Sequence, residues 1–119
     1  MSWTVRFFDE FDDEFQKMPE AVQDALLEQT LLLQQFGPQL GRPRVDTLHG
    51  SEFANMKELR FDAADGVWRV AFAFDPAREG VFLIAGDKSG VSEKMFYKRL
   101  IAKADERYER HLKRLKRAK

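Results

Sequence analysis

The segment 67–74, Val-Trp-Arg-Val-Ala-Phe-Ala-Phe, most constrains the fold, because its side chains alternate with the period of a β-strand. One face carries large apolar side chains, those of Trp68, Val70, Phe72 and Phe74. The other face carries Arg69 and two small side chains, Ala71 and Ala73. The small face predicts a shallow surface on which a flat or extended ligand could lie. The alternative is that helices pack over the alanines and that Arg69 pairs with a carboxylate.

Two further strands are predicted beside this one. Residues 56–61 precede it across a turn at 62–66, and residues 81–85 follow it beyond Asp75-Pro76. Glycine, aspartate and proline at these breaks are typical of tight turns, so the three strands are expected to pair antiparallel. Because segment 81–85 is apolar throughout, we expect it in the interior of the sheet with both faces covered.

Helices are predicted on either side of these strands. A first strand at 3–8 leads into a short helix at 9–18, and Pro19 begins a second helix that stops at Gly37-Pro38. A long amphipathic helix is expected from Ser92 to about residue 116. The side chains expected to face the core are Val22, Ala25, Leu26, Leu33 and Phe36 in the second helix and Met95, Leu100, Ala104, Tyr108, Leu112 and Leu115 in the last.

The segment between the second helix and the next strand, residues 38–52, is predicted to be a loop because it holds two glycines and two prolines. The order of elements is then β-α-α-β-β-β-α. This order indicates a single α+β domain over residues 1–119. In it an N-terminal helical hairpin and a C-terminal helix pack against a twisted, mainly antiparallel sheet.

Charge is unevenly distributed along the chain, although the net charge is zero. Residues 1–36 carry two basic and eight acidic side chains, whereas residues 94–119 carry eleven basic and three acidic ones. Such asymmetry favours an RNA, DNA or acidic-protein partner, and the alternative is an ordinary solvated helix. The acidic and basic regions are also two alternative surfaces for a protein partner.

Composition excludes several common chemistries. The chain has no cysteine, so disulfides, zinc–thiolate sites and thiol nucleophiles are excluded. Its two histidines, His49 and His111, fit no metal-binding pattern, and no phosphate-loop or serine-hydrolase motif occurs, so we expect no metal and no cofactor. The sequence has no signal-peptide pattern and no apolar stretch long enough to span a membrane. We therefore expect a soluble, cytoplasmic protein with no membrane partner.

Cationic side chains near the strand ends are the remaining candidates for chemistry. Arg60 lies at the end of one predicted strand and Arg69 lies within the next. Met56, Glu58 and Arg60 share one face of their strand, whereas Lys57 lies on the other. Lys57 and Arg60 can therefore serve one site only if a bulge or a strand end redirects one of them.

Three further candidates follow the last predicted strand. Lys88 comes directly after it, and Lys94 and Tyr97 begin the last helix. The sheet topology could bring all three near Arg69. A tyrosine or lysine side chain has an ordinary pKa of about 10, so its pKa must be lowered before it can act as a base at neutral pH.

These residues lie in a set of longer strings: Asp46-Thr-Leu-His-Gly-Ser-Glu-Phe-Ala-Asn-Met-Lys-Glu-Leu-Arg60, Trp68-Arg-Val-Ala-Phe-Ala-Phe-Asp75, Gly86-Asp-Lys88 and Phe96-Tyr97. Together the strings resemble the RelE/ParE superfamily, and most of all its HigB-type, phage-related branch. The resemblance covers nearly the whole chain, from the first strand to the last helix. It implies a RelE-like fold.

The resemblance also implies a function. HigB-type proteins are toxins of type II toxin–antitoxin pairs that cleave mRNA on the ribosome without a metal, by attack of the 2′-hydroxyl group on the adjacent phosphate. The implied partners are mRNA on the ribosome and a cognate antitoxin, commonly a helix-turn-helix protein of the HigA type, with operator DNA bound only through the toxin–antitoxin complex.

Matched position by position, the resemblance implies catalytic roles for four residues, Arg60, Arg69, Lys88 and Tyr97. Lys57 fits the family block, and His49 lies where some relatives use a catalytic histidine and others carry a lysine. Lys57, His49 and the nearby Lys94 are candidates for substrate binding, with His49 equally open to being an ordinary loop residue.

Two other functions stay open. The ParE branch shares the fold and inhibits gyrase without cleaving RNA, and the pair formed by Lys88 and Tyr97 is what favours cleavage. A non-catalytic RNA-binding or interaction module that uses the basic last helix is the other alternative.

Overall fold

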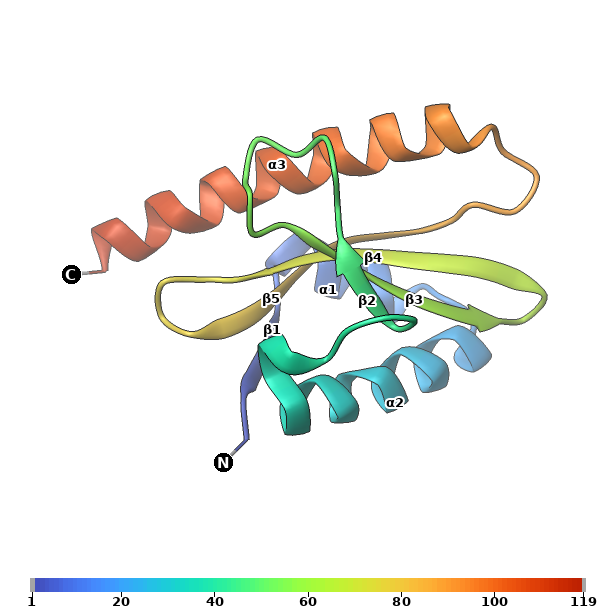
Figure 1. Cartoon of the computed structure of the whole chain (residues 1–119), viewed down its shortest axis with the longest axis horizontal. Helices are drawn as coiled ribbons and strands as arrows, with labels where there is room; N and C mark the ends of the chain where they lie inside the picture. Colours follow the sequence, from blue (N-terminus) through green and yellow to red (C-terminus); the bar gives the residue numbers. More distant parts are fainter. Residues whose placement is uncertain (1, 119) are drawn as a thin grey trace.

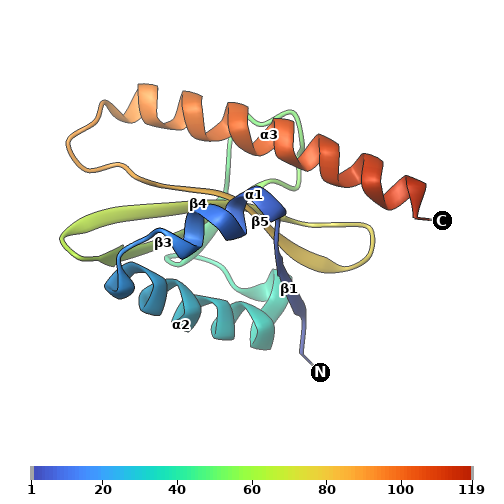
Figure 2. The same cartoon turned by 180° about the vertical axis from the view of Figure 1, so that it is seen from behind.

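The computed structural model describes residues 2–118. Its elements in chain order are β1 (Thr4–Phe7), α1 (Asp9–Gln16), α2 (Glu20–Phe36), the short 3-10 helix η1 (Gly37–Gln39), β2 (Val45–Thr47), β3 (Lys57–Ala63), β4 (Gly66–Phe74), β5 (Glu79–Asp87) and α3 (Glu93–Arg117). The strands form one sheet, with α3 on one face and α2 on the other (Figure 1). A short turn joins α1 to α2, and the two helices run in opposite directions (Figure 2). The predicted α+β class and the predicted helices are confirmed.

The five strands lie in the order β1-β5-β4-β3-β2. β1 pairs with β5 in parallel, and the other neighbours are antiparallel. β5 is an interior strand, as predicted, and Val81, Phe82 and Leu83 on it are fully buried. In the β3–β4 hairpin Arg60 lies directly opposite Arg69, and this register positions the candidate site.

The segment predicted as a loop contains η1 and the strand β2, so that prediction is wrong in part. β2 pairs antiparallel with the start of β3. Three residues are too few to display a period of two, and the surrounding glycines and prolines dominate the pattern. The predicted turn at 62–66 is also shorter in the structure. It consists of Ala64 and Asp65, which have φ angles of 49° and 62°, as a two-residue type I′ hairpin turn requires.

The apolar stripes of the helices differ from the prediction at Phe36 and Met95. Both side chains are 43% exposed. In α2 the buried positions are Val22, Leu26, Thr30 and Leu33, and in α3 they are Phe96, Leu100, Ala104, Arg107, Tyr108 and His111. The core-facing stripe of α3 includes Leu100, Ala104 and Tyr108 as predicted, but it also includes two polar residues that the apolar pattern does not reveal.

The predicted shallow surface beside Arg69 does not exist. Ala71 and Ala73 are fully buried, and α3 lies over this face of the sheet (Figure 1). A Cβ atom on Gly86 would lie 2.9 Å from the ring of Phe96. Small residues in β4 and β5 thus let α3 approach the sheet closely, as in the alternative interpretation.

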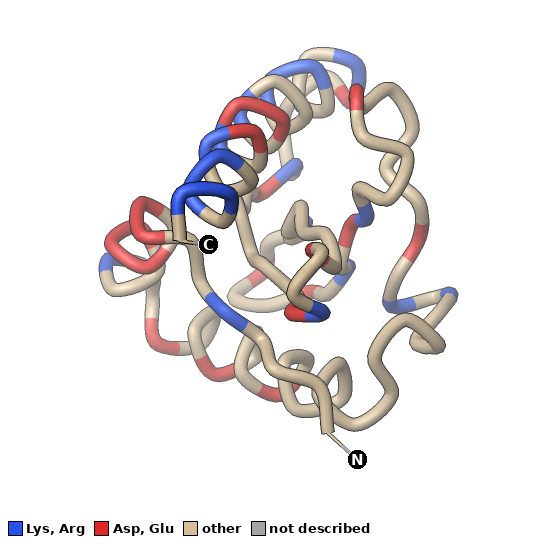
Figure 3. The backbone as a smooth tube through the Cα atoms, turned by 90° about the vertical axis from the view of Figure 1, so that its left-hand side faces the viewer, with Lys and Arg blue, Asp and Glu red and all other residues tan. Residues whose placement is uncertain are grey.

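Some of the opposite charges at the two ends of the chain pair with each other. Arg107 donates to both carboxylate oxygens of Glu14 at 2.8 and 2.7 Å and to the carbonyl of Leu83 at 2.8 Å. Arg110 pairs with Glu10 in the same interface. Figure 3 shows the acidic turns of α1 beside the basic C-terminal turns of α3. The facing sides of α1 and α3 are therefore occupied by each other and are not free for a partner.

Across residues 2–118, none of the helices has the combination of length and apolarity that is needed to cross a membrane.

Candidate functional site

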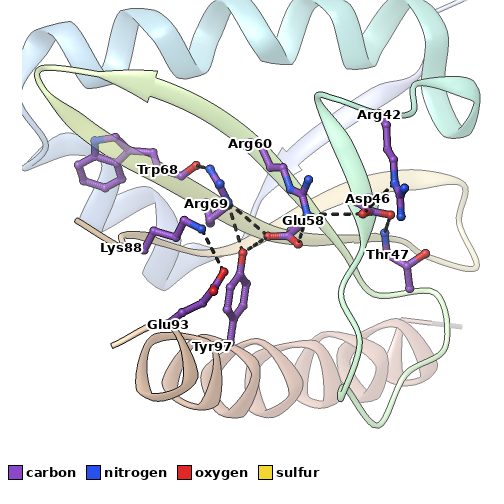
Figure 4. Close-up of polar contacts among 10 residues, drawn as sticks. All are labelled: Arg42, Asp46, Thr47, Glu58, Arg60, Trp68, Arg69, Lys88, Glu93 and Tyr97. Atoms are coloured by element: carbon purple, nitrogen blue, oxygen red, sulfur yellow. Dashed lines mark hydrogen bonds and ion pairs between the residues drawn. The ribbon is translucent and has the colours of Figure 1, made fainter. Parts of the chain in front are cut away.

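A cluster of polar side chains lies where β3, β4 and the start of α3 meet (Figure 4). Glu58 and Arg60 on β3 and Arg69 on β4 occupy the same face, and α3 places Tyr97 against them. The Tyr97 hydroxyl group donates to Oε1 of Glu58 at 2.7 Å, and Nε of Arg69 donates to the Tyr97 oxygen at 3.3 Å. Arg60 donates to Oε2 of Glu58 at 3.1 Å. Glu58 is therefore at the centre of this cluster.

Glu58 is itself buried, with a side chain that is only 6% exposed. Its Oε1 atom also lies 3.6 Å from Nε of Arg69, so two guanidinium groups flank one carboxylate. Burial strengthens such pairing because little water screens the charges. In the free protein Glu58 thus pairs with both Arg60 and Arg69.

β2 contributes a second carboxylate, Asp46. Its Oδ2 atom lies 3.4 Å from Arg60 and 3.1 Å from Arg42. The backbone N–H of Thr47 is the first cause that lowers the pKa of Asp46, and Arg42 and Arg60 lower it further. Arg60 is therefore held between two carboxylates, one from β2 and one from its own strand.

Tyr97 has a raised pKa. Burial is the largest cause and the hydrogen bond to Glu58 the next, while Arg69 acts in the opposite direction. The hydroxyl group is therefore protonated at neutral pH. A base needs the reverse shift, so in this structure Tyr97 is suited to donate a proton and not to accept one.

Lys88 lies on the other side of Tyr97. Its Nζ atom is 3.2 Å from Oε1 of Glu93 and 5.9 Å from the centroid of the Tyr97 ring. The turn after β5 and the first turn of α3 bring these residues together. The structure therefore gathers all four residues for which catalytic roles were predicted, Arg60, Arg69, Lys88 and Tyr97.

The cluster opens into a cavity of about 220 Å³. Its walls are formed by Asp46, Thr47, Leu48, His49, Glu58, Arg60, Glu93 and Tyr97. His49 is exposed at this wall, so the loop histidine faces the same space as Glu58 and Tyr97. Its position is compatible with a substrate contact.

Two predicted substrate-binding residues lie outside the cluster. Lys57 is paired in register with Thr47 and Phe72, on the opposite face of β3 from Glu58, as the parity argument predicted. Lys94 is exposed in the first turn of α3 and does not line the cavity. Within residues 2–118, no group of three or more histidine, aspartate or glutamate side chains could hold a metal ion.

Sequence reasoning missed both carboxylates of the site. A signal was available for Glu58, because it lies two residues before Arg60 and the period of two in a strand places both side chains on the same face. Only cations, a histidine and a phenol were predicted for the site, and a buried guanidinium group also requires an anion to balance its charge. Asp46 could not be placed, because β2 was predicted to be loop.

Comparison with protein families gives a match over residues 13–109 to the family described as phage-derived protein Gp49-like. The chain belongs to this Gp49-like family. Two proteins of Mycobacterium tuberculosis strain H37Rv are similar to it in sequence. "Putative toxin HigB3" is 49% identical over 81 residues, which cover 68% of both chains. "Putative toxin HigB2" is 45% identical over 82 residues, which cover 68% of this chain but 40% of the relative.

The Gp49-like chain also resembles a solved structure, an arginine double mutant of the E. coli toxin RelE in the free state. The TM-score is 0.59 at 13% sequence identity, and the match covers 87% of this chain and 97% of RelE. This likeness confirms the predicted RelE-like fold. The relatives confirm the predicted resemblance to HigB-type toxins.

Proposed function

We propose that this HigB-type chain is a toxin that cleaves mRNA on the ribosome by a metal-independent reaction. Its similarity to the two mycobacterial proteins named as toxins supports the proposal that it is a toxin. The observation that carries the proposed mRNA cleavage is the cluster at the wall of a cavity in which Glu58 contacts Tyr97, Arg60 and Arg69.

The two arginines are suited to hold the scissile phosphate. Guanidinium groups bind phosphate oxygens with paired hydrogen bonds, and Arg60 and Arg69 lie directly opposite each other on neighbouring strands. His49, exposed at the cavity wall, is placed to contact the RNA on the same side. Positioning by the ribosome would supply the rest of the substrate alignment.

In the proposed reaction Glu58 accepts the proton of the 2′-hydroxyl group while the 2′-oxygen attacks phosphorus. The bond from phosphorus to the 5′-oxygen breaks, and Tyr97 protonates this leaving oxygen. The products are a 2′,3′-cyclic phosphate and a free 5′-hydroxyl group. The proton on Glu58 then returns to Tyr97 across the 2.7 Å hydrogen bond that joins them, which restores the site.

The contacts of Glu58 couple these steps. When Glu58 becomes neutral, Arg69 loses its carboxylate partner and Arg60 loses one of its two, so more of their charge is available as negative charge develops on the phosphate oxygens. Such stabilisation is greater in the transition state than in the ground state, which is the condition for catalysis. Loss of the charge on Glu58 also removes one cause of the raised pKa of Tyr97, so the acid becomes stronger when it is needed.

A cognate antitoxin is the expected partner of such a toxin. We propose that it blocks access to the cavity, which keeps RNA from Arg60, or distorts the cluster, which displaces Arg69 as well. The antitoxin would be a helix-turn-helix protein of the HigA type, and operator DNA would be bound only through the complex. The cytoplasm is the place where ribosomes and such a complex would meet.

The test is induced expression of the wild-type chain beside an Arg69→Ala/Tyr97→Phe double variant, with mRNA 5′ ends mapped by their chemistry. Arg117→Ala is the matched control, because Arg117 is an exposed arginine at the far end of α3. New 5′-hydroxyl ends in phase with codons, absent in the double variant and present in the control, are expected. Growth arrest with intact messages and blocked gyrase would contradict cleavage, and RNA binding without cleavage would indicate a non-catalytic module.

A further inference from the structure

The strand β5 has a neighbouring strand on both sides along only part of its length. β1 pairs with it up to Phe82 and then ends, whereas β4 continues beside it as far as Asp87. The carbonyl group of Leu83 accepts from Arg107. Residues 84–86 have no strand on the β1 side within residues 2–118, and they are half-buried. An antiparallel ladder directs the N–H and C=O groups of every second residue away from the partner strand. Residues 84–86 therefore form a short open sheet edge.

An apolar groove lies between this open edge and α3, where the end of β5 passes below the first turns of the helix (Figure 2). Its volume is about 340 Å³. Ile84 and Ala85 of the edge, Val91 of the following loop, and Phe96 and Leu100 of α3 give it an apolar wall. Val91 is 45% exposed. We name this space, together with residues 84–86, the β5 groove.

The half of α3 that borders the β5 groove is basic. Residues 94–104 include Lys94, Lys98, Arg99 and Lys103 and no acidic side chain. Arg99 and Lys103 line the groove. Arg99 forms no ion pair within the described part of the chain, and Lys103 has only an exposed pair with Glu106 at 3.7 Å, a kind of pair that contributes little. By contrast, the cations in the second half of α3 pair with α1. The groove therefore has free positive charge at its rim.

The one acidic residue of the groove is already engaged elsewhere. Oδ1 of Asp87 accepts from the hydroxyl group of Ser89 at 2.6 Å and from the backbone N–H of Val67 at 3.0 Å. These contacts hold the carboxylate toward the turn after β5 and the start of β4. Asp87 thus leaves the charge of Arg99 and Lys103 available to a ligand.

We propose that the β5 groove binds an extended peptide segment of a protein partner, which adds to residues 84–86 as a short strand. The open edge pairs with the peptide backbone, and alternate side chains of an added strand enter the pockets beside it. Apolar side chains of the peptide would pack against Phe96 and Leu100, and acidic ones would pair with Arg99 and Lys103.

Other occupants match these features less well. RNA offers no peptide backbone to the open edge, and its phosphates gain nothing from an apolar wall. In a second copy of the chain, the edge strand β1 carries Arg6 and no acidic residue. The groove shares no lining residue with the cavity beside Glu58. A bound peptide would therefore leave that cavity open, and the proposal does not rest on RNA cleavage.

The first test selects binders of the full chain from a library of random short peptides displayed on phage. Enriched peptides are expected to alternate apolar and acidic residues and to shift the backbone NMR signals of residues 84–86. Val91→Glu and Arg99→Glu, both at exposed positions of the groove, should each weaken binding about ten-fold or more, because they place a negative charge where an apolar or acidic side chain binds. Leu27→Glu and Lys116→Glu are the matched controls, because they make the same changes at exposed positions outside the groove.

A second test asks whether the peptide adds as a strand. Each backbone nitrogen of an enriched peptide is methylated in turn. Only every second N–H group of an added strand faces β5, so methylation should weaken binding at alternate positions. Equal loss at all positions, or no loss at any, would overturn strand addition.

Three further outcomes would overturn the proposed occupant. The first is enrichment of basic peptides, or of peptides that shift signals outside the β5 groove. The second is a concentration-dependent dimer of the wild-type chain that is lost in Val91→Glu, which would assign the edge to a second copy. The third is displacement of the bound peptide by an RNA oligonucleotide, which would assign the groove to RNA. Messenger RNA cleavage is measured separately, so failure of the groove and failure of the proposed function are distinguishable.

Discussion

The hydroxyl group of Tyr97 lies 2.7 Å from Oε1 of Glu58, although the two residues are 39 positions apart in the sequence. Nε of Arg69 contacts the same hydroxyl oxygen at 3.3 Å. The phenol is thus held between an anion that raises its pKa and a cation that lowers it. A single substitution can remove either neighbour. Loss of Glu58 should therefore lower the pKa of Tyr97, and loss of Arg69 should raise it.

Glu58→Gln should lower the pKa of Tyr97. The substitution removes a charge that raises the pKa and leaves Arg69, which lowers it, while burial continues to oppose ionisation. The measurement is a pH titration of the tyrosine ring signals by NMR, which is simple because the chain has only two tyrosines. Glu52→Gln, at an exposed position outside the cluster, is the control. A Tyr97 titration that does not move in Glu58→Gln would show that the carboxylate is not coupled to the phenol.

Arg69→Ala should reduce single-turnover cleavage by about 10²–10³-fold, the usual effect of losing one donor that stabilises developing charge. Its side chain is 12% exposed, and its contacts with Glu58 and Tyr97 hold the guanidinium group in place. The rate is measured on stalled ribosomal complexes with Arg117→Ala as the control. A rate within a few-fold of the wild type would remove Arg69 from the proposed mechanism.

The free energy of unfolding should fall at alkaline pH. Burial raises the pKa of both Tyr97 and Tyr108. A group whose pKa is raised by folding adds stability below its unfolded pKa, here about 10, and this stability is lost as the pH rises through the folded value. Urea unfolding at a series of pH values, from neutral to strongly alkaline, measures how steeply the free energy of unfolding declines with pH. Tyr97→Phe should make the decline shallower above pH 10, and an unchanged slope would be inconsistent with the burial of this phenol.

His111→Leu should destabilise the fold by about 1–3 kcal/mol, the range found when a buried polar group loses a hydrogen-bond partner. Nε2 of His111 lies 2.7 Å from Oδ2 of Asp75, whose side chain has no exposed surface. The substitution leaves this carboxylate buried with the backbone N–H of Glu79 as its remaining donor among the described residues. The measurement is urea unfolding.

A double variant, Asp75→Asn/His111→Leu, separates this effect from lost packing at His111. Removing the charge as well should recover part of the lost stability, because an uncharged amide costs less to bury than a carboxylate. If the double variant were as unstable as the sum of the two single variants, the pair would carry no coupling.

The sequence was most informative where a local pattern determined the structure. Ser92 caps α3 by accepting from the backbone N–H of Met95, and the predicted start of that helix is confirmed. The alternation of segment 67–74 likewise predicted β4. These features depend on neighbours in the chain, which is why propensity and periodicity found them.

Prediction was wrong where tertiary packing reversed a local preference. Arg107 and His111 face the core because Glu14 and Asp75 compensate them, and no pattern within α3 reveals partners that lie far away in the chain. The same limit applied to Glu58, whose role depends on Tyr97 from another element. The cations and the phenol of the candidate site could be named from the sequence, but both of its carboxylates, Glu58 and Asp46, required the structure.

The pairing of α1 with α3 has a consequence for synthesis. α3 is the last described element to be made, yet it carries Tyr97, and its C-terminal half holds α1 through Arg107 and Glu14. Until α3 leaves the ribosome, β3 and β4 lack both the phenol of the site and the helix that covers their alanines. A chain that stops before α3 would therefore be unable to assemble the cluster around Glu58, and the synthesis of α3 would be the step that creates the candidate site.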